Sequence, residues 1–421
     1  MRRESKRTCK SQGGVLVIAL VICGLLGATL GGYLMMVRAQ NMTVARSQAW
    51  NAALTLAEAG AEEALAQLNP GPTIIVDRSA NGWGLPVDGM YGPKTRNLSN
   101  DSYSVGYTAA AMPVIYSTGT VSVPYLSGTV QRILAVTTTN LPIFTVGIGT
   151  KLDINMNGSG IFIDSFNSAD PNLSTGGFYD PAKTGKHGDV ASLRGVVNVG
   201  NATIYGSLYL GPSATDLIKG GGLVTGNIYH DFNADFPDVP LPDTSWIPVK
   251  PLSSATNIDG VSYAYYFGSS GYYTVSASSG NVYIAPNARV RLYAPNSFSP
   301  STLRVAGTGS ATGALELYLG GAFNISGQAQ VDGGICTNLV VFGLPSCTSI
   351  KMGGNASFVG IIYAPEADFS LGGGGSNLYG FIGAVMVNSL SVSGHFAFHF
   401  DENLLSIPPW RGYLATSWKE L

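Results

Sequence analysis

The sequence predicts a long N-terminal helix packed on a small antiparallel sheet, an α+β arrangement, followed by a mainly β domain built as a parallel β-solenoid. Three observations support this prediction: residues 13–37 are apolar and uncharged, residues 39–68 are rich in Ala and contain no Pro, and short motifs recur late in the chain. The expected segments are a basic leader at 1–14, an anchor continuing as an amphipathic helix at 15–69, an antiparallel unit at 70–143, the solenoid at 144–404 and a C-terminal tail at 405–421.

The apolar run reads GGVLVIALVICGLLGATLGGYLMMV. As a helix it would be about 37 Å long, enough to cross a hydrocarbon core of about 30 Å. Basic residues are concentrated before the run, and Arg38 follows it directly. The positive-inside rule therefore keeps the N-terminus in the cytoplasm and exports the bulk of the chain. We expect a single-pass protein of the bacterial cytoplasmic membrane, with most of its residues in the periplasm or at the cell surface.

Two other kinds of signal fit this start less well. A cleaved secretory peptide has an apolar region of about 7 to 15 residues, shorter than this run, although Val37-Arg38-Ala39 is an acceptable cleavage site. A lipoprotein signal ending at Cys23 would need a small residue where this chain has Ile22. What remains is an uncleaved anchor, or one trimmed at the Gly13-Gly14-Val15 junction.

The Ala-rich segment carries one apolar stripe at helical spacing. Its members are Trp50, Leu54, Ala57, Ala61, Leu65 and Leu68. Asn69-Pro70-Gly71-Pro72 ends the helix. Extended stretches follow at 103–109, 114–123 and 129–138, so we expect the stripe to form the core between the helix and an antiparallel meander.

The basic leader, the Gly13-Gly14 pair and the Ala/Glu-rich stretch 56–64 resemble the N-terminal region of type IV pilin-like proteins. The resemblance is to the minor pilins called PilX and to the minor pseudopilins of type II secretion. It implies that a prepilin peptidase cuts after Gly14, that Val15 begins the mature chain, and that the helix packs with other pilin-like subunits. The fifth mature position is Ala19, where major pilins carry Glu and some minor members do not.

The end of the chain contains an internal repeat. Ile350–Gly354 recurs as Phe369–Gly373 and as Leu390–Gly394, and Gly360–Ala364 recurs as Gly380–Ala384. Short strands that return about every 20 residues, with Gly or Asn at the corners, are typical of stacked solenoid coils. The repeat predicts that Gly360 and Gly380 are parallel neighbours and that Ile361 and Ile382 point inward. A two-sheet sandwich is the structural alternative.

This region also resembles a bacterial exported β-helical domain of unknown function that is often found behind PilX-type N-termini. The stretches 199–206, 360–367 and 394–402 carry the resemblance. The segment Ile362-Tyr363-Ala364-Pro365 is similar to segments of surface adhesins. The resemblance implies an architecture and a surface location.

Composition narrows the classes of partner. Charged residues make up 11% of the chain and the net charge is −2, so no basic surface for nucleic acid is expected outside the leader. Cys336 and Cys347 lie in the exported part, where an oxidising environment favours a disulfide between them. We expect no cofactor.

Two polar groups are candidates for a metal site. On a strand, His395, His399 and Asp401 would face outward while Phe396, Phe398 and Phe400 face the core. Two His and one Asp are ligands that Zn²⁺ accepts, but a polar outer face is the simpler interpretation. The carboxylates of Asp153, Asp164, Asp170 and Asp180 lie in a turn-rich stretch where Ca²⁺ ligation competes with ordinary turn chemistry. Neither group is assigned as metal-binding or catalytic.

The sequence therefore favours a structural or interaction protein, anchored by its helix and displaying the solenoid in a type IV pilus or a related secretion filament. A surface adhesin that binds glycan through exposed Tyr and Trp is one alternative. The other is a membrane-anchored carbohydrate-active enzyme.

Overall fold

The computed structural model describes residues 13–69, 81–124, 128–242, 244–353, 357–373, 380–406 and 410–421. They form two units. The helix–sheet unit comprises residues 13–68, 81–124, 128–139 and 414–421. The parallel-strand unit takes up the described residues from Asn140 to Tyr413. The parallel-strand unit is thus inserted into the sequence of the helix–sheet unit.

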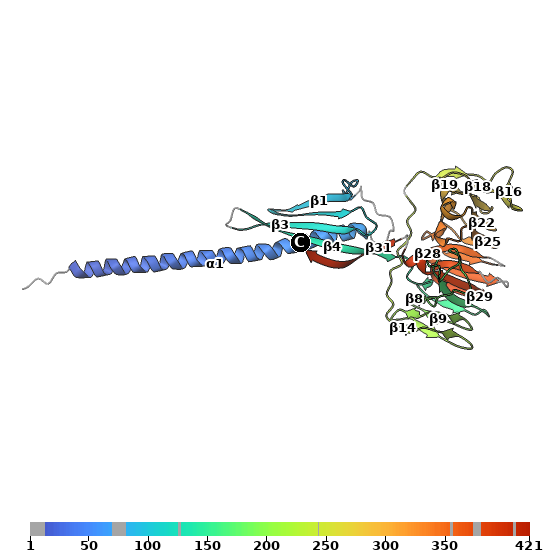
Figure 1. Ribbon diagram of the computed structural model, residues 1–421, viewed down its shortest axis with the longest axis horizontal. Coiled ribbons are helices and arrows are strands. Elements are labelled where there is room, and N and C mark those ends of the chain that lie inside the picture. The colour runs from blue at the N-terminus through green and yellow to red at the C-terminus, as the bar shows by residue number, and fades with distance from the viewer. Residues whose placement is uncertain are drawn as a thin grey trace, which may run out of the picture. The chain divides into compact units, whose positions relative to one another are not determined.

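A single helix, α1 (Gly13–Leu68), begins the helix–sheet unit (Figure 1). The sheet has the order β1-β2-β3-β4-β31. Its strands are β1 (Met90–Leu98), β2 (Asp101–Thr108), β3 (Val114–Ser122), β4 (Thr129–Pro142) and β31 (Trp410–Glu420). Strands β1 to β4 form an antiparallel meander. The expected C-terminal tail is therefore largely a strand, whose Glu420 forms an ion pair with Arg132 of β4.

The C-terminal half of α1 packs on the sheet through small residues. Ala53, Ala57 and Ala61 are completely buried, whereas Trp50 is 49% exposed. A Cβ atom on Gly119 of β3 would lie 2.0 Å from the carbonyl oxygen of Ala53, so the helix backbone rests directly on the strand. The predicted stripe was wrong for Trp50, because this close approach selects the Ala face of the helix, whereas Leu68 of the stripe is buried as expected.

Glu63 fastens the helix to the edge of the sheet. Its carboxylate accepts hydrogen bonds from Arg96 Nε at 2.9 Å and from the Tyr103 hydroxyl at 2.7 Å, and Lys94 Nζ lies 3.0 Å away. The hydrogen bonds from Arg96, together with those from Tyr103 and Lys94, lower the pKa of Glu63 to about 2 against the opposing effect of burial. The helix–sheet contact thus depends on an ionised Glu63.

The parallel-strand unit consists of short strands and a few single 3₁₀ turns. The strands are β5 (Ile148–Thr150), β6 (Ile154–Met156), β7 (Phe162–Phe166), β8 (Val190–Ser192), β9 (Val196–Asn198), β10 (Thr203–Ile204), β11 (Leu208–Leu210), β12 (Thr215–Leu217), β13 (Leu223–Val224), β14 (Ile228–Tyr229), β15 (Ile247–Val249), β16 (Thr256–Ile258), β17 (Val261–Tyr263), β18 (Tyr265–Phe267), β19 (Gly271–Val275), β20 (Val282–Ile284), β21 (Arg289–Ala294), β22 (Thr302–Val305), β23 (Ala314–Leu319), β24 (Phe323–Ile325), β25 (Gln328–Val331), β26 (Leu339–Gly343), β27 (Ser349–Met352), β28 (Phe358–Gly373), β29 (Phe381–Gly394) and β30 (Ala397–Asp401). The 3₁₀ turns are η1 (Gly309–Ala311), η2 (Cys336–Asn338) and η3 (Glu402–Leu405).

Apart from the β16–β17 hairpin, these strands pair in parallel and form three stacks. Stack A has the order β14-β11-β8-β5-β29-β28-β26-β23-β21-β19-β15. Stack B has the order β12-β9-β6-β29-β28-β27-β24. Stack C has the order β13-β10-β7-β30-β29-β28-β25-β22-β20-β18. The long strands β28 and β29 belong to all three stacks.

Alternate side chains of most of these strands enter a common apolar core. In stack C the rings of Phe358, Phe381 and Phe398 lie one above another, with centroid distances of 4.9 and 5.4 Å. All three are at most 3% exposed. The inward stacking of apolar residues predicted from the repeat is present in this column.

The chain starts in the middle of the stacks. It builds β5 to β14 toward one end, crosses to the other end, and returns through β15 to β30 (Figure 1). The return closes when β29 pairs with β5 and β6 and β30 pairs with β7; we call these pairings the seam. The crossing connection lies along the outside of stack A, where Phe236 and Val239 are buried and the Tyr363 hydroxyl donates to the Pro237 carbonyl at 2.8 Å.

The pairing of β28 with β29 is parallel, as expected, but its register differs from the prediction. Gly360 pairs with Gly383 rather than Gly380, and the offset shortens after an irregularity between Ala364 and Asp368. Ile382 is half-buried on the outer face instead of pointing inward, because its neighbour Phe381 occupies the core side of the strand. Ile361 is buried, but against the residues that cover stack A rather than in the central core.

Candidate functional site

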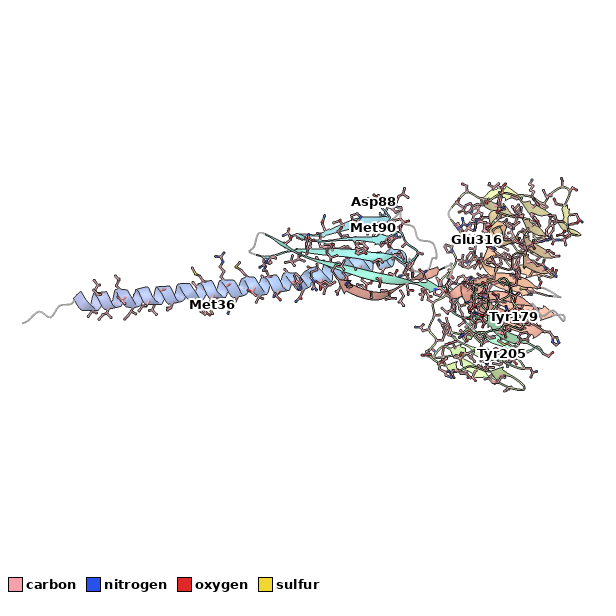
Figure 2. All side chains as sticks on the ribbon, in the orientation of Figure 1. Met36, Asp88, Met90, Tyr179, Tyr205 and Glu316 are labelled. Atoms are coloured by element: carbon pink, nitrogen blue, oxygen red, sulfur yellow. The ribbon has the colours of Figure 1, made fainter. Side chains whose placement is uncertain are left out.

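The N-terminal half of α1 is an apolar surface with no partner in the described chain. Val15 is 75% exposed and Leu26 is 62% exposed, and the side chain of Met36 projects outward from the helix (Figure 2). By length and composition α1 is the one described helix able to cross a membrane. Burial of such a surface in lipid, or against similar helices, removes its contact with water.

The expected processing site lies in the first turn of α1. No heavy atom lies within 4 Å of a Cβ placed on Gly14, so nothing in the described chain covers this peptide. The leader preceding Gly13 lies outside the described residues. Cleavage between Gly14 and Val15 stays a prediction.

A second candidate is a buried polar cluster at the seam. His399 of β30 pairs in register with Asp164 of β7, and the His399 Nδ1 to Asp164 Oδ1 distance is 2.6 Å. The Tyr179 ring stacks on the imidazole at 3.7 Å, and its hydroxyl donates to Asp164 Oδ2 at 2.9 Å. All three residues are buried, with His399 fully inaccessible. These contacts tie β7 and β30, which are remote in sequence, to the segment that carries Tyr179.

The expectation that His399 and Asp401 lie on a solvated outer face was wrong. His399 does point away from the core, but residues 167–189, between β7 and β8, pass over this face and cover it. Asp401 Oδ1 accepts the Ser168 amide at 3.0 Å, and its Oδ2 lies 3.7 Å from Cys336 Sγ. The sequence of β30 gives no sign that it is covered, because the covering loop lies more than 200 residues earlier.

The expected disulfide is absent, because Cys336 and Cys347 are both free, buried thiols. Cys347 belongs to the central core, whereas Cys336 packs among the residues outside stack A. Burial raises the pKa of Cys347 to about 11, and burial together with the neighbouring Asp401 carboxylate raises the pKa of Cys336. The two cysteines lie on opposite faces of the stacked strands, one inside and one outside. Their closeness in sequence therefore does not bring the two sulfur atoms together.

Neither suggested group of metal ligands is assembled, although His399 of one group and Asp164 of the other lie 2.6 Å apart. Within the described parts of the chain, no cluster of three or more His, Cys, Asp or Glu is suited to hold a metal ion. His395 is exposed and lies 3.2 Å from Ser159 Oγ. Asp170 and Asp180 accept the backbone amides of Asn172 and Ala182, two residues ahead, which is ordinary Asx-turn chemistry.

Two pockets flank the covering segment on the outer face of stack C. One has a volume of about 510 Å³ and is lined by Asp164, Tyr179 and Tyr205 among others. The other, of about 460 Å³, lies beside Phe178 and includes Val359 and Ile382. Sequence reasoning missed both. The available signal was the Gly176-Gly177 turn, which is followed directly by an aromatic pair.

The comparisons with known proteins give little functional information. A family model described as a domain of unknown function (DUF7305) matches residues 253–407. No curated protein matches the chain. A crystal structure of the competence-associated pilin ComZ from Thermus thermophilus is similar at 14% identity, covering 88% of this chain and 97% of that one. Its TM-score of 0.31 is too low to establish a shared fold.

Proposed function

We propose that the protein is a membrane-anchored, pilin-like structural or interaction protein that displays the parallel-strand unit outside the cytoplasmic membrane. The observation that carries the proposal is the division of α1. Its first half is apolar, uncharged and exposed, while its second half packs through Ala residues on an antiparallel sheet. One rigid helix can thus join a membrane or a bundle of like helices to a folded head.

We further propose that the parallel-strand unit is a β-solenoid. The three parallel stacks with a shared apolar core support this assignment. Its role would be display and contact rather than catalysis, because Asp164, His399 and Asp401 are committed to buried structural contacts. By resemblance, the protein would act as a minor subunit of a type IV pilus or a type II secretion-like filament, with prepilin peptidase and other pilin-like subunits as partners.

The test is the N-terminus of the exported protein. We expect membrane-associated chains that begin at Val15. The variant Gly14→Val should retain the leader, whereas Gly31→Val, an equivalent change in open space on the same helix, should be processed normally. N-terminal sequencing and mass spectrometry of the membrane fraction provide the measurement. An exported pool with Met1 intact in the unaltered protein would contradict the filament-subunit proposal.

A further inference from the structure

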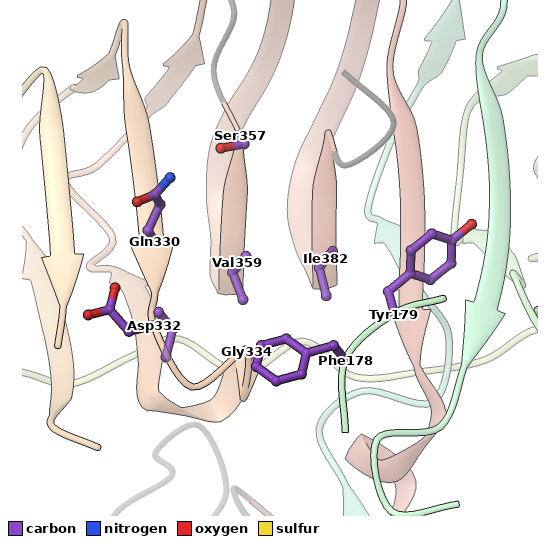
Figure 3. A pocket seen from close by; sticks show the side chains of 9 residues that line it. Phe178, Tyr179, Gln330, Asp332, Gly334, Ser357, Val359 and Ile382 are labelled. Atoms are coloured by element: carbon purple, nitrogen blue, oxygen red, sulfur yellow. The ribbon is translucent and has the colours of Figure 1, made fainter. Parts of the chain in front are cut away.

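The pocket beside Phe178 has walls of two chemical kinds (Figure 3). One side is apolar and includes Phe178, Val359 and Ile382, and the other carries Gln330 and Asp332; Ser357 lies next to Val359 on the same segment. Its volume of about 460 Å³ lies within the usual range for small-molecule sites.

The apolar side chains of the pocket interrupt a row of polar side chains on stack C. On the outer face of stack C, Tyr266, Tyr283, Arg304 and Gln330 follow one another in register. Val359 and Ile382 come next as a registered pair, and His399 pairs with Ile382. Val359 and Ile382 are both half-buried. Two neighbouring apolar side chains in a row of polar ones form a small flat platform.

The aromatic wall is rigidly presented. Thr175 and Phe178 exchange two backbone hydrogen bonds of 3.0 and 3.1 Å around Gly176 and Gly177, which both have positive φ. The Phe178 ring also rests on Gly334, where an added Cβ would lie 2.4 Å from a ring atom. The ring is nevertheless 47% exposed. A fixed, half-exposed aromatic ring is suited to stack on a ligand without further loss of side-chain entropy.

The polar wall carries one carboxylate, which an arginine holds in place. Asp332 is the charged residue that lines the pocket, and its carboxylate accepts from Arg304 Nε at 3.0 Å and from Nη2 at 3.2 Å. Arg304 Nη1 also donates to Asp259 Oδ2 at 2.6 Å, so one arginine holds two carboxylates in place and the group keeps a net negative charge. Uncharged hydroxyl groups can hydrogen-bond to Asp332, Gln330 and Ser357, whereas the net negative charge disfavours an anionic ligand.

We propose that this pocket binds one or two units of a neutral saccharide. A sugar ring presents an apolar C–H face, which fits the platform and Phe178, and hydroxyl groups at its edge, which fit the opposite wall. The inference relies on the proposed function only for the location of the pocket outside the cytoplasm. Binding itself is a property of the parallel-strand unit and does not need the anchor to be processed.

The experiment applies the full chain in detergent to an array of neutral hexose and N-acetylhexosamine oligosaccharides. Sulfated and uronic-acid oligosaccharides on the same array provide the charged comparison. Retained neutral sugars are then titrated calorimetrically. We expect Phe178→Ala to weaken binding by about tenfold or more. Ile382→Phe, which fills the pocket without removing the aromatic wall, should weaken it at least as much. Tyr229→Ala, at a partly exposed aromatic residue (39% against 47% for Phe178) at the end of stack A, is the control and should bind normally.

The assignment would be overturned if the unaltered chain retained no neutral saccharide, or retained charged saccharides only. It would also be overturned if both pocket variants kept their thermal transitions and still bound neutral saccharides. Shortening of a retained oligosaccharide would instead contradict the non-catalytic role proposed above while supporting the pocket. A leader that is not cleaved would contradict the filament proposal without affecting sugar binding. The two proposals therefore fail separately.

Discussion

The seam contact between Asp164 and His399 should be worth several kcal/mol to the parallel-strand unit. Asp164→Ala removes the acceptor for His399 Nδ1 and for the Tyr179 hydroxyl, both in buried surroundings. Hydrogen bonds to a charged group contribute about 1.5–3 kcal/mol each, so the loss of both bonds costs about 3–5 kcal/mol. We therefore expect Asp164→Ala to destabilise the seam by about 3–5 kcal/mol, and Asp164→Asn, which keeps one acceptor, by less.

Because the protein has two units, a single unfolding midpoint would mix their transitions. Hydrogen exchange resolved by mass spectrometry separates them. Amides of β7 and β30 should exchange roughly 100-fold faster or more in Asp164→Ala, if they open through the seam. The matched control is Asp170→Ala in the same covering segment, whose carboxylate serves an exposed turn. Equal exchange in Asp164→Ala and the control would refute the view that the buried pair closes the seam.

Three further predictions concern other parts of the chain. Glu63 has its pKa lowered to about 2, so its ionised form should stabilise the helix–sheet unit by about 1–2 kcal/mol above pH 4.5. This contribution should decrease as the pH falls from 4.5 toward 2. When thermal stability is measured against pH, the decrease over this range should be absent in Glu63→Gln. Gly119→Val should destabilise the same unit by about 3 kcal/mol because its side chain meets the helix backbone, whereas Gly128→Val, in open space, should change its melting temperature little. Cys336 and Cys347 should resist alkylation in the native protein. After denaturation without reductant, each should take one label. If the mass of the unlabelled protein were lower by two hydrogens, the two cysteines would instead form a disulfide.

The sequence was sufficient for features that depend on local pattern. The uninterrupted apolar run and the Ala-rich segment predicted one long helix, and α1 spans Gly13–Leu68. The recurring Gly-containing motifs predicted parallel strands with stacked apolar residues, and both are present. In each case the signal is a periodicity set by the geometry of the helix or strand itself.

Features that depend on contacts with distant segments could not be predicted from local sequence pattern. The exposure of Trp50 follows from how closely the sheet approaches the helix, which is decided at Gly119. The burial of His399 follows from a covering segment that belongs to a different part of the chain. The register of β28 on β29 shifted because an irregularity within β28 changes the spacing of the repeat. Each error concerns a contact between segments that local pattern does not relate.

The route of the chain through the stacks has a consequence for its folding during synthesis. Strands β5 to β14 emerge first and can pair among themselves, but the edge formed by β5, β6 and β7 stays open until β29 and β30 arrive. The contact that completes it joins residues 235 positions apart. Contacts of such long range form slowly, and open strand edges readily pair with other chains. The newly made chain therefore passes through a stage at which its central edge is exposed, and this stage is where folding helpers or premature self-association would act.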